Sequence, residues 1–301
     1  MVKISRGLTG YRRRFRAAPA VVVLILAAWP LPAVSQGDLE QARRLYQLTD
    51  YEGSLKVLQA METKDAPVYE LMGQDHYMQG EYKKAADLLD KALAADPANS
   101  DYELWLGRAF GRRAETASPL TAAPHAHKAR QHFEKAVQLN PRNKEALSDL
   151  FEYYLQAPGF MGGGLNKASD IANQMAAIDP VEGQRAQARL AEKKKEFGSA
   201  EEHLQRAAEL APRQAGRLID LAKFLARHGR LAESDQSFRK AEKIAPNSPQ
   251  VIYARADTYI QQGRNLEVAR KLLERYLQAQ LSPDDPSRAA AEKLLKKASG
   301  G

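Results

Sequence analysis

The stretch "GEYKKAADLLDKALAADP" at residues 80–97 decides the fold, because the chain repeats it closely as "GRLAESDQSFRKAEKIAP" at residues 229–246. Both stretches open with Gly and end with Pro, and their apolar residues recur at intervals of three and four. That spacing is typical of an amphipathic helix. A helical segment that recurs within one chain indicates an array of repeated helical units.

Further copies of this pattern occur along most of the chain, and a proline ends each of them. The copies KALAADP, KAVQLNP, QMAAIDP, RAAELAP and KAEKIAP end at Pro97, Pro141, Pro180, Pro212 and Pro246. The intervals between these prolines are 44, 39, 32 and 34 residues. We therefore expect helix–turn–helix units with a period near 34 residues, some of them lengthened by insertions.

This pattern resembles the tetratricopeptide repeat, in which two antiparallel helices form a unit of 34 residues. Two units carry the family's small, aromatic and apolar residues most fully. In the second unit these are Tyr69, Met72, Gly73, Ala85, Leu89, Ala92 and Pro97. In the sixth they are Leu218, Leu221, Ala222, Leu225, Gly229, Phe238, Ala241 and Pro246.

The resemblance implies an all-α fold, a single-domain right-handed α-solenoid over residues 36–299. Its seven units begin near Gln36, Ala66, Ser100, Lys144, Gly183, Ala215 and Pro249. A final helix at residues 287–298, with Ser287 as its N-cap, is expected to cover the exposed end of the stack.

Small residues are expected where neighbouring helices approach closely, because one helix pair cannot bury its apolar face alone. These residues are Gly73, Gly107, Ala222, Ala85, Ala129, Ala168 and Ala200. The aromatic residues at helical spacing are predicted to pack in the core. They are Tyr46, Tyr69, Phe110, Tyr154, Phe238 and Tyr259.

Residues 1–35 have the three parts of an export signal. A basic stretch ends in YRRRFR, an apolar run follows at residues 17–29, and small residues stand at Ala33 and Ser35. We expect cleavage after Ser35 and a periplasmic or secreted protein. A membrane anchor is the alternative, but about 20 apolar residues are needed to cross a bilayer and this run is shorter. The RRRF segment also resembles the core of a twin-arginine signal.

The charge of the chain argues against a nucleic-acid binder. Residues 1–35 contain six of the 45 Lys and Arg residues and no acid, so the remainder carries 39 basic against 37 acidic side chains. A body with a net charge of +2 has no general attraction for nucleic acid. A charge run such as AEKKKEF is read as a solvated helix surface.

The third and fourth units carry insertions between their first and second helices. The insertions are about ten residues around AETASPLTAAPHAH and about five in APGFMGGGLNKA. We expect two loops that are neighbours at one edge of the stack. Gly162, Gly163 and Gly164 could bind an anion at the next helix start, although the spacing of a phosphate-binding loop is not met. Phe160 and Met161 are expected to pack inward.

No catalytic signature is found, and no enzyme activity, cofactor or metal is expected. The chain has no Cys, which excludes a thiol nucleophile, a disulfide framework and a zinc–thiolate site. His125, His127 and His132 lie together but lack a nearby Cys or carboxylate that would complete a metal site. An enzyme, or a metal- or nucleotide-binding protein, with its site in the insertions remains the alternative.

A candidate binding surface lies on the first helices of units three and four. Asp101, Trp105, Arg108 and Arg112 share one helical stripe, and Trp flanked by Arg is favoured at binding centres. The alternative places Trp105 against the neighbouring unit with both Arg side chains solvated. The remaining candidates are Glu145, Glu152, Phe160 and Met161.

The resemblance implies a protein that binds a peptide or partner protein in a groove lined by the first helices. We therefore predict a non-catalytic interaction scaffold of the bacterial cell envelope. The candidate surface includes the edge that the two insertions form, and the mixed charge of the groove requires a partner with both signs.

Overall fold

The computed structural model of the protein describes residues 36–299, which belong to one compact unit. The expected signal peptide, with its cleavage position at Ser35, lies outside the described residues. The described residues form fifteen α-helices and a single 3-10 turn, with no strand among them, so the predicted all-α repeat array is confirmed. None of these helices combines the length and the apolar character that crossing a bilayer requires.

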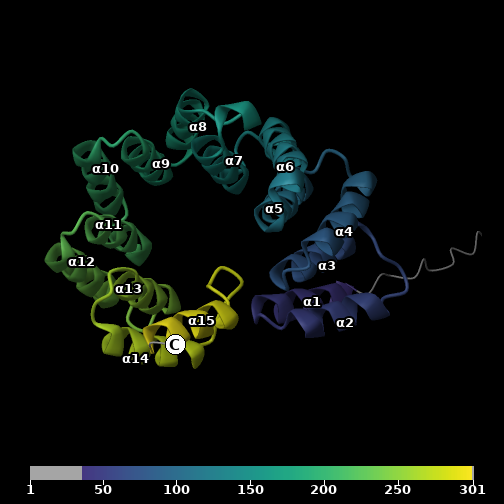
Figure 1. Cartoon of the computed structure of the whole chain (residues 1–301). Helices are drawn as coiled ribbons and strands as arrows, with labels where there is room; N and C mark the ends of the chain where they lie inside the picture. Colours follow the sequence, from purple (N-terminus) through teal and green to yellow (C-terminus); the bar gives the residue numbers. More distant parts are fainter. Residues whose placement is uncertain (1–35, 300–301) are drawn as a thin grey trace, which may run out of the picture. The chain divides into compact units, whose positions relative to one another are not determined.

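The helices form seven consecutive pairs and a final single helix (Figure 1). The first four units are α1 Gln36–Gln47 with α2 Tyr51–Ala60, α3 Ala66–Met78 with α4 Tyr82–Ala95, α5 Ser100–Thr116 with α6 Pro119–Leu139, and α7 Lys144–Gln156 with α8 Leu165–Ile178. The next three are α9 Pro180–Lys193 with α10 Phe197–Leu210, α11 Ala215–Arg227 with α12 Leu231–Ile244, and α13 Pro249–Gln261 with α14 Leu266–Leu277. The 3-10 turn η1 is Gly159–Met161, and α15 is Arg288–Ala298.

The first helices form one face of the array. Each first helix packs on its own second helix, and first helices of successive units also contact one another from α1 to α9 and from α11 to α13. Among the described residues, no second helix contacts the second helix of the next unit. Residues on the first helices of neighbouring units are therefore brought side by side on that face.

Side-chain caps set the start of many helices. The carboxylate or amide oxygens of Asp65, Asn99 and Asn143 accept hydrogen bonds from backbone N–H groups of the first turn. Asp179 is both the C-cap of α8 and the N-cap of α9, which has a proline in its first turn. As a result α9 begins at Pro180, slightly before the expected position near Gly183.

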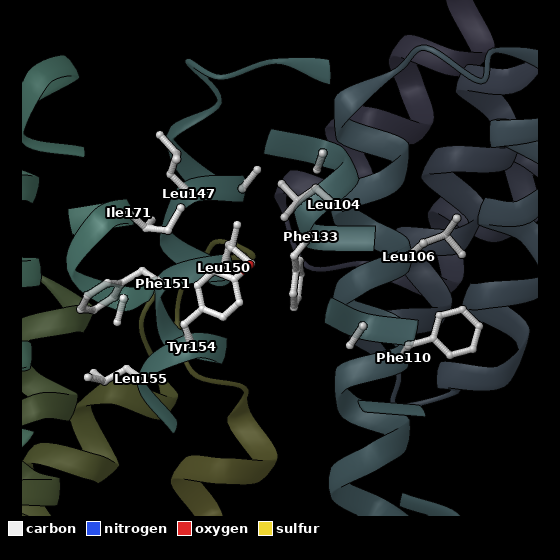
Figure 2. Packing of buried hydrophobic residues seen from close by; sticks show 14 of the residues in the cluster. Leu104, Leu106, Phe110, Phe133, Leu147, Leu150, Phe151, Tyr154, Leu155 and Ile171 are labelled. Carbon is white, nitrogen blue, oxygen red and sulfur yellow. The ribbon is translucent and has the colours of Figure 1, made fainter. Parts of the chain in front are cut away.

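Phe133 of α6 belongs to the largest core cluster and packs inside unit three. Figure 2 shows this ring between Leu104 and Leu106 of α5 and Leu150 of α7. Gly107 allows the close approach, because a Cβ built there would lie 2.5 Å from the Phe133 ring. Small residues thus permit tight helix pairing, as the repeat pattern indicates.

The predicted packing roles hold for most of the selected residues. Ala85, Ala129, Ala168, Ala200 and Ala222 are fully buried or nearly so. Among the aromatic residues, the buried ones are Tyr46, Phe110, Tyr154, Phe238 and Tyr259, whereas Tyr69 is only half-buried. The ammonium of Lys91 lies over its ring, 5.4 Å from the centroid.

The prediction of a loop in unit three is wrong, because the insertion is helical. It lengthens both helices of the unit, and only Ala117 and Ser118 separate α5 from α6. The segment is rich in Ala, and Pro119 stands in the first turn of α6, where a missing N–H costs nothing. The inserted residues therefore extend the hairpin beyond the length of its neighbours.

The run AEKKKEF is also not a continuous helix surface. Helix α9 ends at Lys193, and Lys195 has a backbone φ of 64° in the turn before α10. The three lysines are exposed, as expected. They therefore stand at the end of a helix and in a turn.

The final helix α15 covers the last unit by packing on both α13 and α14. The Ser287 Oγ accepts a hydrogen bond from the Ala290 N–H at 3.2 Å and caps the helix. Ala291, Leu294 and Leu295 contribute to the core of this end.

Candidate functional site

The two insertions line a groove of about 550 Å³, called here the insertion groove. On one side the extended hairpin contributes mostly small side chains, Gly111, Ala114, Ala126 and Ala129, together with Phe133. On the other side stand residues from the end of α7 and the segment after it, Tyr153, Ala157, Pro158 and Met161. The walls are mainly apolar, and their polar groups come from the first helices.

The second insertion folds back onto its own helix. The Gly164 N–H donates to the Tyr154 carbonyl at 2.8 Å, and the Tyr153 hydroxyl donates to the Met161 carbonyl at 2.8 Å. Gly162 has a φ of 87°, in the left-handed region that favours glycine. The Lys167 ammonium donates to the Gly162 carbonyl at 3.0 Å. These contacts explain the glycine-rich segment without a bound phosphate.

Phe160 does not pack inward, so that prediction is wrong for this residue. Its side chain is 88% exposed, whereas its neighbour Met161 lines the insertion groove. The short 3-10 turn contains both residues and contacts α6. Because Met161 takes the inward position of this turn, Phe160 faces solvent.

Arg108 links units three and four across the first-helix face. Its Nε donates to Asp149 at 2.6 Å and its Nη2 donates to Glu145 at 2.8 Å. The guanidinium also lies 4.7 Å from the centre of the Trp105 ring, which packs edge-on against Tyr77 of the preceding unit. Burial raises the pKa of Asp149, and the Arg108 charge partly offsets this. Arg108 is therefore neither solvated nor free to bind a partner's carboxylate.

Arg112 binds to the preceding unit in a similar way. Its Nε and Nη2 each donate to the Tyr82 hydroxyl at 3.2 Å, and its guanidinium lies over the Tyr82 ring. It also pairs with Glu115 on its own helix. Trp105 packs against a neighbouring unit, as the alternative interpretation predicted. That interpretation also placed both Arg side chains in solvent, but Arg108 and Arg112 are hydrogen-bonded within the protein.

The structure divides the predicted site residues between two hollows. Arg112, Glu152 and Met161 line the insertion groove, together with Arg108. Asp101, Trp105 and Glu145 line a second hollow on the first-helix face, which Arg108 also borders. Phe160 lines neither hollow, so the eight candidates do not converge on one point.

Several of the groove residues missed by the sequence interpretation are small or belong to the second insertion. Gly111, Ala126, Ala129 and Pro158 carry no chemical signal of their own. Their role depends on the helical form of the first insertion. The Ala-rich segments on both sides of Ser118 favour a helix, and they are the one signal in the sequence that could have predicted this form.

Ion pairs between units continue along the first-helix face. Arg189 of α9 donates to both carboxylate oxygens of Glu152, at 2.6 and 2.9 Å. Between α9 and α11 the pairs are Arg185–Asp220 at 2.7 Å, Arg217–Glu182 at 3.1 Å and Arg227–Glu192 at 3.0 Å. These pairs join the charges of one unit to those of the next along the face.

Two of the three histidines of unit three, His125 and His132, make ring contacts. The His132 Nδ1 lies 2.6 Å from a Glu103 carboxylate oxygen, a partner that the sequence did not indicate. The ring of His132 stacks on Phe110, and His125 stacks on the same ring. Within residues 36–299, no group of three or more His, Asp or Glu side chains is arranged to hold a metal ion.

Comparisons with known proteins agree with this architecture. Sequence profiles described as tetratricopeptide repeat match residues 66–99 and 185–249. No curated protein sequence matches the chain significantly.

Two similar solved structures are those of tetratricopeptide repeat proteins. One is a thermophilic protein of Thermus thermophilus, 19% identical, with a TM-score of 0.53 over 63% of this chain and 98% of that one. The other is from Parabacteroides merdae, 14% identical, with a TM-score of 0.59 over 87% of this chain and 98% of that one. At these identities the likeness shows the fold.

Proteins of this repeat family are protein–protein interaction scaffolds and are generally non-catalytic. The paired helices, the small residues at their contacts and the two matching profiles point to the same family. This chain is therefore a tetratricopeptide repeat protein.

Proposed function

We propose that the protein is a non-catalytic scaffold of the bacterial cell envelope that binds a peptide or partner protein in the insertion groove. One observation carries this proposal. The two units that depart from the regular repeat are neighbours, and their insertions supply opposite walls of the same groove. Concave sites with apolar walls and few polar groups are the usual places for ligand binding.

The polar groups of the groove indicate what the partner contributes. Arg108, Arg112 and Glu152 already have partners within the protein, so they present satisfied hydrogen-bonding groups. If an apolar side chain of a partner covers these groups, each charge still has its counterion within the protein. We therefore propose that the partner inserts apolar side chains between the small residues of the hairpin and Met161.

A substitution of Gly111 tests the groove without disturbing the core. A Cβ at this position meets no atom within 4 Å, so the Gly111→Leu side chain fills the groove. Gly198→Leu is the matched control, because Gly198 lies on α10 with equally open space. A partner captured from envelope extracts should bind Gly111→Leu at least tenfold more weakly than Gly198→Leu. Equal binding by the two variants would refute the groove as the site.

Export to the envelope is the second part of the proposal. The basic stretch, the short apolar run and the small residues at Ala33 and Ser35 support it. Intact-mass measurement of the exported protein should find a chain that begins near Gln36. Recovery of an uncleaved chain held in the membrane would contradict the proposed soluble envelope protein.

A further inference from the structure

Three consecutive lysines stand at the end of α9 with no partner. The side chains of Lys193, Lys194 and Lys195 are exposed, and none makes a hydrogen bond or ion pair within residues 36–299. Most Arg side chains of the first-helix face are, by contrast, paired with carboxylates of the next unit. The lysines, called here the basic turn, carry three positive charges against the single exposed carboxylate of Glu196 beside them, so the turn keeps a net positive charge.

The backbone of the basic turn is unfavourable for lysine. Lys195 has a φ of 64°, in the left-handed region. The residue two positions after the first helix is left-handed in four other units, where it is Thr49, Gly80, Gly229 and Gly263. Glycine adopts this conformation without the steric cost that a side chain carries. Unit five therefore keeps a lysine where glycine would be the more stable choice.

The turns between first and second helices lie at one edge of the array, because their neighbouring ends contact each other. The 3-10 turn of unit four contacts α6 of unit three. Glu152 near the end of α7 pairs with Arg189 near the end of α9. The ring of Phe197 at the start of α10 contacts the His228 ring of the next turn at a tilted angle, with centroids 4.3 Å apart. The basic turn and the turn that bears Phe160 thus belong to consecutive units and lie at the same edge of the array.

Exposed apolar side chains gather at this same edge. Phe160 in the turn of unit four is 88% exposed, and Phe197 beside the basic turn is 43% exposed. The other large apolar side chains exposed at this edge are Leu48, Leu165, Leu266 and Val268. At the opposite edge only Leu210 and Ile244 are comparably exposed among the described residues. Apolar and basic side chains therefore point to solvent from the same edge.

We propose that this edge binds the headgroup region of an anionic lipid bilayer, with Lys193, Lys194 and Lys195 as its basic contacts and Phe160 and Phe197 as its apolar ones. Basic side chains beside exposed aromatic ones match an anionic lipid surface, where ammonium groups meet phosphate and the rings enter the acyl boundary. A nucleic-acid duplex would use the charges but leave the rings exposed, because its bases are already stacked. The lysines and both rings lie outside the lining of the insertion groove, although Phe160 is adjacent to Met161, which lines it.

Vesicle sedimentation tests this proposal with residues 36–301, which contain all the described helices of the compact unit. The probes are vesicles of phosphatidylcholine alone and of phosphatidylcholine with phosphatidylglycerol. The parent chain should sediment with the anionic vesicles only, and high salt should release it. Replacing the three lysines by Gln should weaken binding at least tenfold, since each lysine near an anionic surface contributes roughly a fivefold effect. Phe160→Ser should weaken it severalfold.

Matched variants distinguish vesicle binding by the basic turn from a general effect of positive charge. Replacing Arg239, Lys240 and Lys243 of α12 by Gln removes the same charge from exposed positions without ion pairs, and it should leave vesicle binding within twofold of the parent. Lys195→Gly should weaken binding while the melting temperature stays equal or rises by about 1–3 °C, because the backbone strain is relieved.

Two outcomes would overturn the proposal. One is equal loss of vesicle binding in the α12 variant and the basic-turn variant. The other is tighter binding of a Glu-rich peptide or an oligonucleotide than of anionic vesicles, which would assign the basic turn to an acidic protein or a nucleic acid. Neither outcome bears on the groove, since partner binding is measured with the Gly111 variants.

Discussion

Asp75 is the residue whose burial most clearly affects stability. Its side chain is fully buried between α2 and α3, and one carboxylate oxygen accepts a hydrogen bond from the Ser54 hydroxyl at 2.7 Å. The other oxygen has no partner within the described protein. Burial raises the pKa of this carboxyl to about 7, Ser54 lowers it and the charge of Asp50 raises it further. The folded state therefore holds a proton that the unfolded chain releases at a lower pH.

This proton makes stability depend on pH. Because the folded pKa lies above the unfolded one, the free energy of unfolding should fall as pH rises from about 4 to about 7. Asp75→Asn retains an acceptor for Ser54 and removes the titration, so the fall should become shallower. Urea unfolding at a series of pH values measures how the free energy of unfolding changes in the parent chain and in Asp75→Asn. Glu70, whose burial also raises its pKa to about 7, contributes to the same window, and Glu70→Gln is the comparison. An unchanged pH profile in Asp75→Asn would exclude a raised pKa at Asp75.

Two glycines one turn apart on α5 should respond oppositely to the same change. A methyl group at Gly107 meets the Phe133 ring at 2.5 Å, whereas one at Gly111 meets nothing. Gly107→Ala should destabilise the fold by about 1–3 kcal/mol, because the ring is held in the core. Gly111→Ala should be neutral or stabilising by up to about 1 kcal/mol, because Ala favours the helix. Thermal unfolding compares them, and equal midpoints would contradict the packing of α5 on α6.

At the scale of elements, contact between first helices is uneven along the array. Helices α7 and α9 are in backbone contact, but α9 and α11 are not, and a groove of about 460 Å³ is lined by both. Arg185 and Arg217 cross from one helix to the other through their carboxylate partners. Polar pairs therefore bridge α9 and α11 where their backbones do not touch.

Because of these cross-helix ion pairs, the stability of this region should depend on the salt concentration. Arg185→Gln removes contacts to both Asp220 and Glu182, and it should destabilise the fold by about 1 kcal/mol at low salt and by less at high salt. Arg206→Gln is the matched control, because Arg206 pairs only with Glu209 on its own exposed helix face and should change stability by less than about 0.5 kcal/mol. Urea unfolding at two salt concentrations compares the variants. If the control lost as much stability as Arg185→Gln, the bridge between α9 and α11 would have no special role.

At the scale of the whole described chain, the core is divided among several clusters. The largest extends from α4 to α9, and separate clusters serve the N-terminal units, the region around α10 and α11, and the C-terminal end. In such an array each unit is stabilised mainly by its neighbours. A change at one end should therefore act locally.

Removal of α15 tests this local character. A chain that ends at Ala279 exposes Leu273 and Tyr276 of α14, which the final segment covers. Hydrogen exchange should become faster in α13 and α14 and remain the same in α6 and α8, which do not border the removed segment. Uniformly faster exchange along the chain would show that the array unfolds as one cooperative unit.

The sequence by itself determined the helical units and their packing residues. Spacings of three and four, the recurring proline and small residues at fixed places act within one or two turns of a helix, so they can be read locally. Ala85, Phe238 and Tyr259 are buried for this reason. The same logic did not determine the ends of elements, because a segment such as residues 113–124 is compatible with both loop and helix until its neighbours are known.

Only the tertiary structure decided the surface. Arg108 meets carboxylates that lie 37 and 41 residues later, and Arg189 meets one 37 residues earlier. Phe160 is exposed because the turn that bears it packs through Met161, and the insertion groove exists because two separate insertions lie against each other. Partners at such separations are chosen by the stacking of one unit on the next. Helical periodicity places a side chain on a face but does not specify what that face meets.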